Sequence, residues 1–180
     1  MINIQEVHEV KYKINLDAEK LAPVVYYEML KVLDILAKTD SKEDIKKSIG
    51  EYYYFINDYL FTTSFDIVEY ILRSERYRKA YVNDIIMLFA GYVIDRLIKK
   101  IVPVNDPDIY RHCIFDDDNG IYAVKCKIVK IFVNKPYDNI YQKMIDMLKK
   151  HNYAYSEALK IATALGLDID QCVYVNSRCS

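Results

Sequence analysis

The stretch VNDIIMLFAGYVIDRLIKKI, residues 82–101, is the most apolar part of the chain and decides its fold. Apolar residues recur in it at spacings of three and four, which is the period of an α-helix. They cover most of the helix circumference, and such a helix lies in a protein core or in a membrane. The uncharged run, residues 85–94, is shorter than the ~20 residues that a membrane span needs. The stretch therefore predicts a central core helix that ends before Pro103.

The composition predicts one domain, or one domain with a small appendage, and a sizeable core. The chain has 180 residues, of which 52% are hydrophobic, and a formal net charge of −1. This charge exerts no global attraction on nucleic acid or an anionic membrane, although a local basic patch can still bind one. The 18 Tyr and the abundant Ile, Lys and Asp are typical of an AT-rich genome, such as that of a virus or an archaeon. Residues 1–13 lack a signal-peptide core, so we expect a cytoplasmic protein with no membrane partner.

Helical periodicity also precedes the central stretch. Residues 23–38 and 45–60 carry apolar stripes at helical spacing. Pro23 is expected at the first position of its helix and Ser41 as the cap of the next. Residues 6–16 alternate imperfectly, which predicts a short strand with one buried face. Together these segments predict a helical bundle with a short N-terminal strand over residues 1–103.

The sequence changes character near residue 103. Residues 113–115 and 121–133 flank the dipeptide Asn119-Gly120, which tolerates the positive φ angles of a tight hairpin turn. They predict a β-hairpin, and the residues after them predict two helices and a terminal strand. The predicted fold class is α+β and helix-dominated, with this C-terminal part, residues 104–180, packed against the bundle as one unit.

The last segment of the chain is a candidate nucleic-acid reader. A helix over 158–165, capped by Ser156 and ended by Gly166, resembles the second helix and turn of a helix-turn-helix. With the hairpin as a wing, it would be a winged-helix variant. The stretch in the place of the recognition helix, residues 168–175, carries two acids and no base, although a reading helix must face phosphates and base edges. Three interpretations stay open: a DNA reader, a packing or dimerisation element, and an ordinary capped helix.

Two basic patches are further candidate nucleic-acid sites. In the first, cations alternate with Tyr rings, a pattern that can hold phosphates and stack on bases. The alternative is a solvated helix face whose Tyr side chains cover the edge of the core. In the second, lysines lie on the predicted hairpin. The candidate residues are Arg73, Arg76, Tyr77, Arg78 and Lys79 in the first patch, and Lys125, Lys127 and Lys130 in the second.

No motif for catalysis, metal binding or cofactor binding is recognisable in the sequence. The four cysteines form no Cys-x-x-Cys pair, so structural zinc is not expected. The acids after Asp116 do not match a calcium loop, and Lys127 lacks the acidic residue two positions earlier that a metal-dependent nuclease needs. Phosphate-binding glycine motifs and a Ser nucleophile motif are absent as well. We expect a non-catalytic protein without a metal or cofactor.

Two functional interpretations follow. The first is a small regulatory or accessory protein that binds DNA or RNA through the basic patches and the C-terminal segment. The second is a helical-bundle protein-interaction module with an apolar groove for a partner helix. A homodimer that buries such a surface is compatible with both. In the second interpretation, adaptable methionines would line the groove, and the alternative is that they are core residues: Met29, Met87, Met144 and Met147.

The central stretch resembles one helix of a known family. Over some twenty residues it is similar to the central helix of the helical-bundle apoptosis regulators carried by some large DNA viruses. The likeness rests on its hydrophobicity and on the pair Ala90-Gly91. The Asn-Trp-Gly-Arg signature of that family is absent, because Asp84 and Ile85 follow Asn83. The resemblance favours the protein-interaction interpretation.

Overall fold

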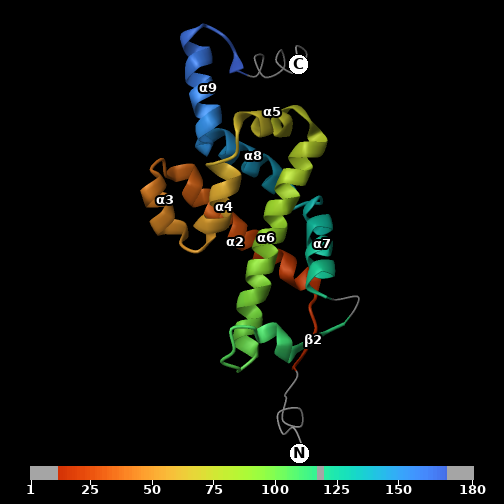
Figure 1. Ribbon diagram of the computed structural model, residues 1–180. Helices are drawn as coiled ribbons and strands as arrows, with labels where there is room; N and C mark the ends of the chain where they lie inside the picture. Colours follow the sequence, from red (N-terminus) through yellow and green to blue (C-terminus); the bar gives the residue numbers. More distant parts are fainter. Residues whose placement is uncertain (1–11, 117–119, 170–180) are drawn as a thin grey trace, which may run out of the picture.

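The computed structural model describes residues 12–116 and 120–169 as a helix-dominated fold with two short strands (Figure 1). This confirms the predicted dominance of helices. The strands are β1 (Tyr12–Ile14) and β2 (Cys113–Phe115), and a 3₁₀ turn, η1 (Ile109–His112), precedes β2. The helices are α2 (Ala18–Lys38), α3 (Lys42–Ile49), α4 (Tyr52–Leu60), α5 (Phe65–Arg73), α6 (Glu75–Ile101), α7 (Ile121–Phe132), α8 (Asn139–His151) and α9 (Tyr153–Ala164).

Helix α6 is the axis of the molecule. It is 27 residues long and packs against α2, α4, α5, α7 and α8. Its start lies at Glu75, earlier than the central apolar stretch alone indicates, because the chain breaks only at Ser74, between α5 and α6. Among the described residues, no helix is both long and apolar enough to cross a membrane.

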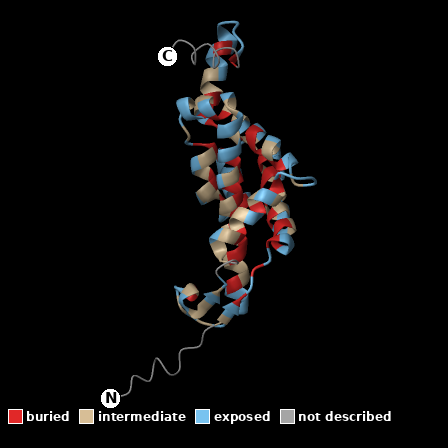
Figure 2. Ribbon diagram, turned by 90° about the vertical axis from the view of Figure 1, so that its right-hand side faces the viewer, coloured by how far each residue is buried: buried red, intermediate tan, exposed pale blue. Residues whose placement is uncertain are grey.

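The core lies between α6 and the helices around it. Buried residues follow the inner sides of these helices (Figure 2). On α6 they include Ile85, Phe89 and Val93, and on α2 they include Met29 and Leu36. Helices α7 and α8, from the C-terminal part, pack on α2 and α6.

Two helix boundaries in the first half differ from the prediction. Helix α2 begins at Ala18, because the side chain of Asp17 caps it by accepting a hydrogen bond from the Glu19 amide at 3.0 Å. Pro23 therefore lies inside the helix. The single helix expected over 45–60 is split into α3 and α4 at Gly50, whose φ of +57° ends α3. The predicted cap at Ser41 is confirmed.

The predicted hairpin is wrong. Strand β2 pairs with β1 rather than with the segment after it, and the pairing is parallel, with Tyr12 opposite Cys113. Residues 121–132 form helix α7, which starts after Gly120 and buries Val124, Ile128 and Phe132. These three residues recur every four positions, so they lie on one helix face, whereas a strand would alternate them with polar residues. Asn119 lies outside the described residues.

The winged-helix detail is not confirmed. Helix α9 starts at Tyr153 with Asn152 as its cap, rather than after Ser156. Its predicted end is confirmed, because Gly166 has a φ of +71° and the Leu167 amide donates to the Ala162 carbonyl at 2.8 Å. The predicted strand over 172–175, most of the recognition-helix stretch and the first part of the strand over 6–16 lie outside the described residues.

His151 connects the end of α8 to the end of α2. Its burial leads us to predict that the stability of the folded protein depends on pH. Its Nε2 lies 2.7 Å from the Leu36 carbonyl oxygen, so this nitrogen carries the donated proton. Burial of the ring lowers the pKa of His151. The unfolded chain therefore takes up a proton before the folded protein does, and we expect stability to be complete above pH ~6.5 and to fall below it.

Urea unfolding between pH 7.5 and pH 5.5 measures this effect. The variant His151→Gln keeps an N–H donor near Leu36 but does not titrate. We expect the free energy of unfolding of this variant to vary less over that range than that of the wild type. Equal pH dependence in both proteins would contradict the role given to His151.

Candidate functional site

One face of α6 is open to solvent along a groove. Two hollows of about 650 and 460 Å³ adjoin at Tyr59 and Asp84, which line both. We call the two hollows together the α6 groove. Its floor is one stripe of α6 at helical spacing that spans about 27 Å. The floor residues are Tyr77, Ala80, Tyr81, Asp84, Met87, Leu88, Gly91, Tyr92 and Asp95.

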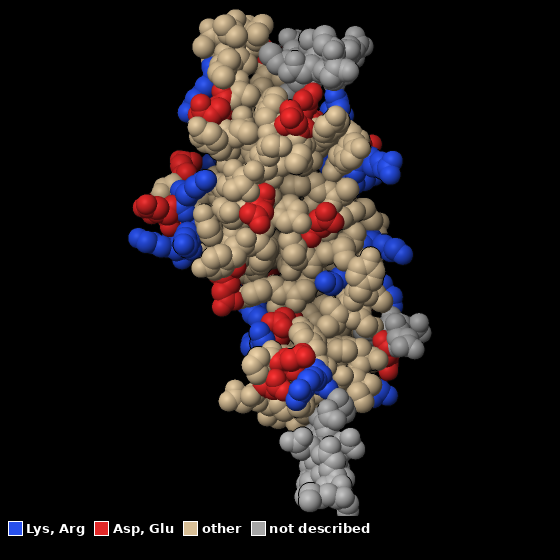
Figure 3. Space-filling model, viewed as in Figure 1, with Lys and Arg blue, Asp and Glu red and all other residues tan. Residues whose placement is uncertain are grey.

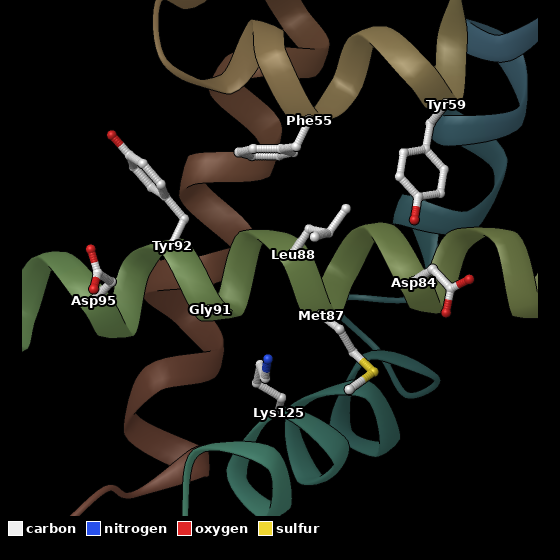
Figure 4. Close-up of a pocket in the computed structure, with 9 residues that line it drawn as sticks. All are labelled: Phe55, Tyr59, Asp84, Met87, Leu88, Gly91, Tyr92, Asp95 and Lys125. Atoms are coloured by element: carbon white, nitrogen blue, oxygen red, sulfur yellow. The ribbon is translucent and has the colours of Figure 1, made fainter. Parts of the chain in front are cut away.

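The walls of the α6 groove come from three other helices and one loop. Helix α4 contributes Phe55, Asp58 and Tyr59, the α4–α5 loop contributes Thr63, and α5 contributes Ile67 and Ile71. Lys125 of α7 lies on the opposite side of the floor from Phe55 and Tyr59 (Figure 4). Two large side chains of the groove are well exposed, Ile67 at 53% and Tyr77 at 52%. Exposed apolar side chains in a concave surface are typical of a site that binds a partner.

Contacts behind the groove hold its α4 wall in place. Phe55 packs edge-on against the buried ring of Phe89, with 5.3 Å between centroids. The hydroxyl of Tyr52 donates to Glu28, whose carboxylate lies 3.3 Å from Arg96. These contacts join α2, α4 and α6, so the groove is formed before any partner binds.

Gly91 lies at the middle of the floor and has no structural requirement to be glycine. A Cβ built at this position would meet Lys125 only, with Nζ at 3.6 Å and Cδ at 3.7 Å, which is ordinary contact with a flexible side chain. Glycine inside a helix costs about 0.5–1 kcal/mol relative to alanine. The missing side chain at Gly91 leaves space beside the α6 backbone, into which the flexible side chain of Lys125 extends.

The two ends of the groove differ in their electrostatics. At one end, partial burial would raise the pKa of Asp95, but hydrogen bonds from Lys99 and Tyr110 hold it below its ordinary value. At the other end, burial raises the pKa of Tyr59, and the nearby carboxylates of Asp84 and Asp58 raise it further. Among the described residues, neither of these two carboxylates forms an ion pair. This end is therefore acidic.

The first basic patch forms the corner between α5 and α6. Arg73 pairs with Glu69 at 3.5 Å and lies over the ring of Tyr70. Arg78 donates to the Leu72 carbonyl across the corner. Both arginines therefore have partners within the protein itself.

The other three residues of the first patch lie in different surroundings. Lys79 pairs with Glu75 at 3.3 Å, and Arg76 is exposed. Tyr77 packs near the ring of Tyr70 and enters the α6 groove. The patch therefore contributes one aromatic side chain to the groove and presents Arg76 to solvent.

The second basic patch lies on helix α7 and is divided between two faces. Lys127 and Lys130 are exposed, whereas Lys125 is half-buried beside Gly91. On the face that carries α4, α6 and α7, most positive side chains lie toward the edges, and the middle is mostly uncharged with a few separate acidic groups and one isolated positive group (Figure 3). Of the candidate residues, Tyr77 and Lys125 line the α6 groove, and Arg78 and Lys79 line a separate smaller hollow between α6 and α8.

The described residues place no metal site. No three side chains of His, Cys, Asp or Glu within this part of the chain come close enough together to hold an ion. The Nε2 of His112 instead donates a hydrogen bond to the Asp106 carboxylate at 3.0 Å. The thiol of Cys113 donates to the Ile109 carbonyl at 3.4 Å, and neither Cys113 nor Cys126 forms a disulfide with another described residue.

Sequence reasoning found only part of the α6 groove. Of the methionines expected to line a groove, Met87 does so, whereas Met29 and Met144 are fully buried. It missed Asp84 and Gly91 as floor residues and the walls from α4 and α5. Asp84, Leu88, Gly91 and Asp95 recur at helical spacing, so their common face could have been read from the sequence.

The chain matches no family model, no curated protein and no solved structure. The resemblance of the central stretch to the viral apoptosis regulators therefore stays a prediction. The function must be inferred from the α6 groove itself.

Proposed function

We propose that this protein is a non-catalytic interaction module that binds a helical segment of another protein in the α6 groove. The observation that carries the proposal is Gly91, a helix-interior glycine that packing does not require, at the centre of a preformed apolar groove. A groove of about 27 Å accommodates roughly 18 residues of helix. A partner helix would place one apolar stripe on Met87, Leu88 and Tyr92.

Two synthetic peptides of about 20 residues test this proposal. Both carry leucines at helical positions i, i+3, i+4 and i+7. Peptide K has lysines at the flanking positions, and peptide E has glutamates there. We expect at least one labelled peptide to bind the wild-type protein, as measured by fluorescence anisotropy.

The variant Gly91→Leu tests the place of binding. The new side chain has room at its Cβ and would fill the groove, so the fold should be kept or slightly stabilised. Filling the contact surface should weaken peptide binding about 10- to 100-fold. The control Ala164→Leu adds the same side chain at an exposed position of α9 and should change nothing. Unchanged affinity in Gly91→Leu, or no binding of either peptide, would overturn the proposal.

Binding of DNA or RNA stays a second candidate because Arg76, Lys127 and Lys130 are exposed. Labelled duplex DNA, single-stranded DNA and RNA at low and moderate salt test it. Binding that weakens steeply with salt, and further in Arg76→Ala, would favour this function. No binding at low salt would exclude it.

A further inference from the structure

We propose that the partner of the α6 groove is a basic amphipathic helix, whose cations lie against the carboxylates of Asp58 and Asp84 while its apolar stripe covers Met87 and Gly91. This inference rests on the proposed function and adds the chemistry of the partner. It also fixes which part of the groove the cations occupy.

The carboxylates lie at one end of the groove on two different helices. Asp58 is on α4 and Asp84 is on α6, and both line the same hollow together with Tyr59. Both residues are exposed, and no ion pair with another described residue neutralises them. By contrast, Asp95 at the other end lies 2.7 Å from Lys99. A partner cation therefore gains most at the end of Asp58 and Asp84.

The apolar floor begins one turn from Asp84. Met87, Leu88 and Gly91 follow it along α6, and Ile67 and Ile71 flank the acidic end from α5. A cation alone would not cover these side chains, and an apolar helix alone would leave two carboxylates in a partly desolvated contact. A helix with both an apolar stripe and a basic flank satisfies the two requirements together.

Lys125 affects whether a basic or an acidic partner binds more tightly. Its side chain extends from α7 toward Gly91, at the middle of the floor (Figure 4). No ion pair with another described residue fixes it, so it can swing aside when a helix enters. Because its charge repels a basic helix, removal of the ammonium should tighten binding of such a helix. A nucleic-acid partner would respond to the same change in the opposite way.

Peptides K and E test the inference against the wild type, Asp58→Asn with Asp84→Asn, and Lys125→Ala. The control Asp34→Asn with Asp146→Asn makes the same change in net charge at exposed positions outside the groove. We expect peptide K to bind the wild type more tightly than peptide E. The groove double variant should bind peptide K about 3- to 10-fold more weakly and with less salt dependence, whereas the control should bind as the wild type does. Lys125→Ala should bind peptide K more tightly.

The outcomes separate the two proposals. Equal binding of both peptides that is lost in Gly91→Leu would keep the groove as a helix site and overturn its preference for a basic helix. Tighter binding of peptide E, or equal weakening of peptide K by the control, would overturn the preference as well. Binding of peptide K that persists in Gly91→Leu would overturn both proposals.

Discussion

Replacement of Phe89 by alanine is expected to lower the free energy of unfolding by about 3–5 kcal/mol, the range for a large aromatic side chain removed from a core. Phe89 is 1% exposed and lies at the middle of α6. Its ring stacks on Tyr52 with 5.0 Å between centroids and meets the edge of Phe55. No small movement of α4 can fill the space left by the ring, because Tyr52 is also held by Glu28.

Thermal and urea unfolding of Phe89→Ala measure this loss. The melting temperature should fall by about 10–15 °C for a chain of this size. Tyr54→Ala removes a ring from the same aromatic region, but Tyr54 is 72% exposed, so its effect should stay within about 0.5 kcal/mol. A loss below about 1 kcal/mol in Phe89→Ala would show that α6 is not the centre of the core.

Replacement of Asn152 by alanine is expected to cost about 2–4 kcal/mol, because one side chain satisfies two backbone groups. Asn152 is fully buried. Its Oδ1 accepts from the Tyr155 amide at 2.8 Å and caps α9. Its Nδ2 donates to the Thr63 carbonyl at 2.9 Å, which ties the start of α9 to the loop before α5.

Comparison of Asn152→Ser with Asn152→Ala separates the contributions of the two hydrogen bonds of Asn152. Asn152→Ser keeps a capping oxygen, but its side chain is too short to reach Thr63. Its free energy of unfolding should therefore lie between those of the wild type and Asn152→Ala. Asn134→Ala changes an exposed asparagine and should have little effect. Urea unfolding of the three proteins checks the order. Equal stabilities of Asn152→Ala and Asn134→Ala would contradict the role of this side chain.

Helix α6 could be predicted because the hydrophobic pattern that indicates it lies within one continuous stretch of sequence. A long apolar run with helical spacing has one structural solution in a chain of this length, and the residues that the run places inward, such as Ile86 and Val93, are buried. The N-terminal boundary was less certain from the sequence because the helix continues through the charged residues 75–79, whose i, i+4 pair Glu75–Lys79 supports a helix.

The parallel pair of β1 and β2 could not be predicted from local sequence. Its strands are three residues each, and Tyr12 pairs with Cys113, which comes far later in the sequence. The Asn119-Gly120 dipeptide indicated a hairpin, but tertiary packing overrode this local preference. Val124, Ile128 and Phe132 bury more as one face of a helix on α2 and α6 than they would in an isolated hairpin.

The candidate site depends on the placement of helices that are distant in the sequence. The spacing of Asp84, Gly91 and Asp95 was available, but nothing local shows that Phe55 and Lys125 lie on opposite sides of that stripe. The basic patches were visible as composition, and the Glu69–Arg73 pair follows from i, i+4 spacing within α5, whereas the partner of Arg78 comes only from the corner between α5 and α6. A charge pattern identifies the candidate residues of a site, but it does not show which residues of other helices lie beside them.

The central claim is that the open face of α6 binds a partner helix. Titration of isotope-labelled protein with peptide K, followed by amide chemical shifts, tests it most directly. We predict that the largest shifts lie at Asp84, Met87 and Gly91 and on the facing wall at Tyr59. The largest shifts at Lys127 and Lys130, or on the exposed apolar residues of α9 around Leu165, would contradict it.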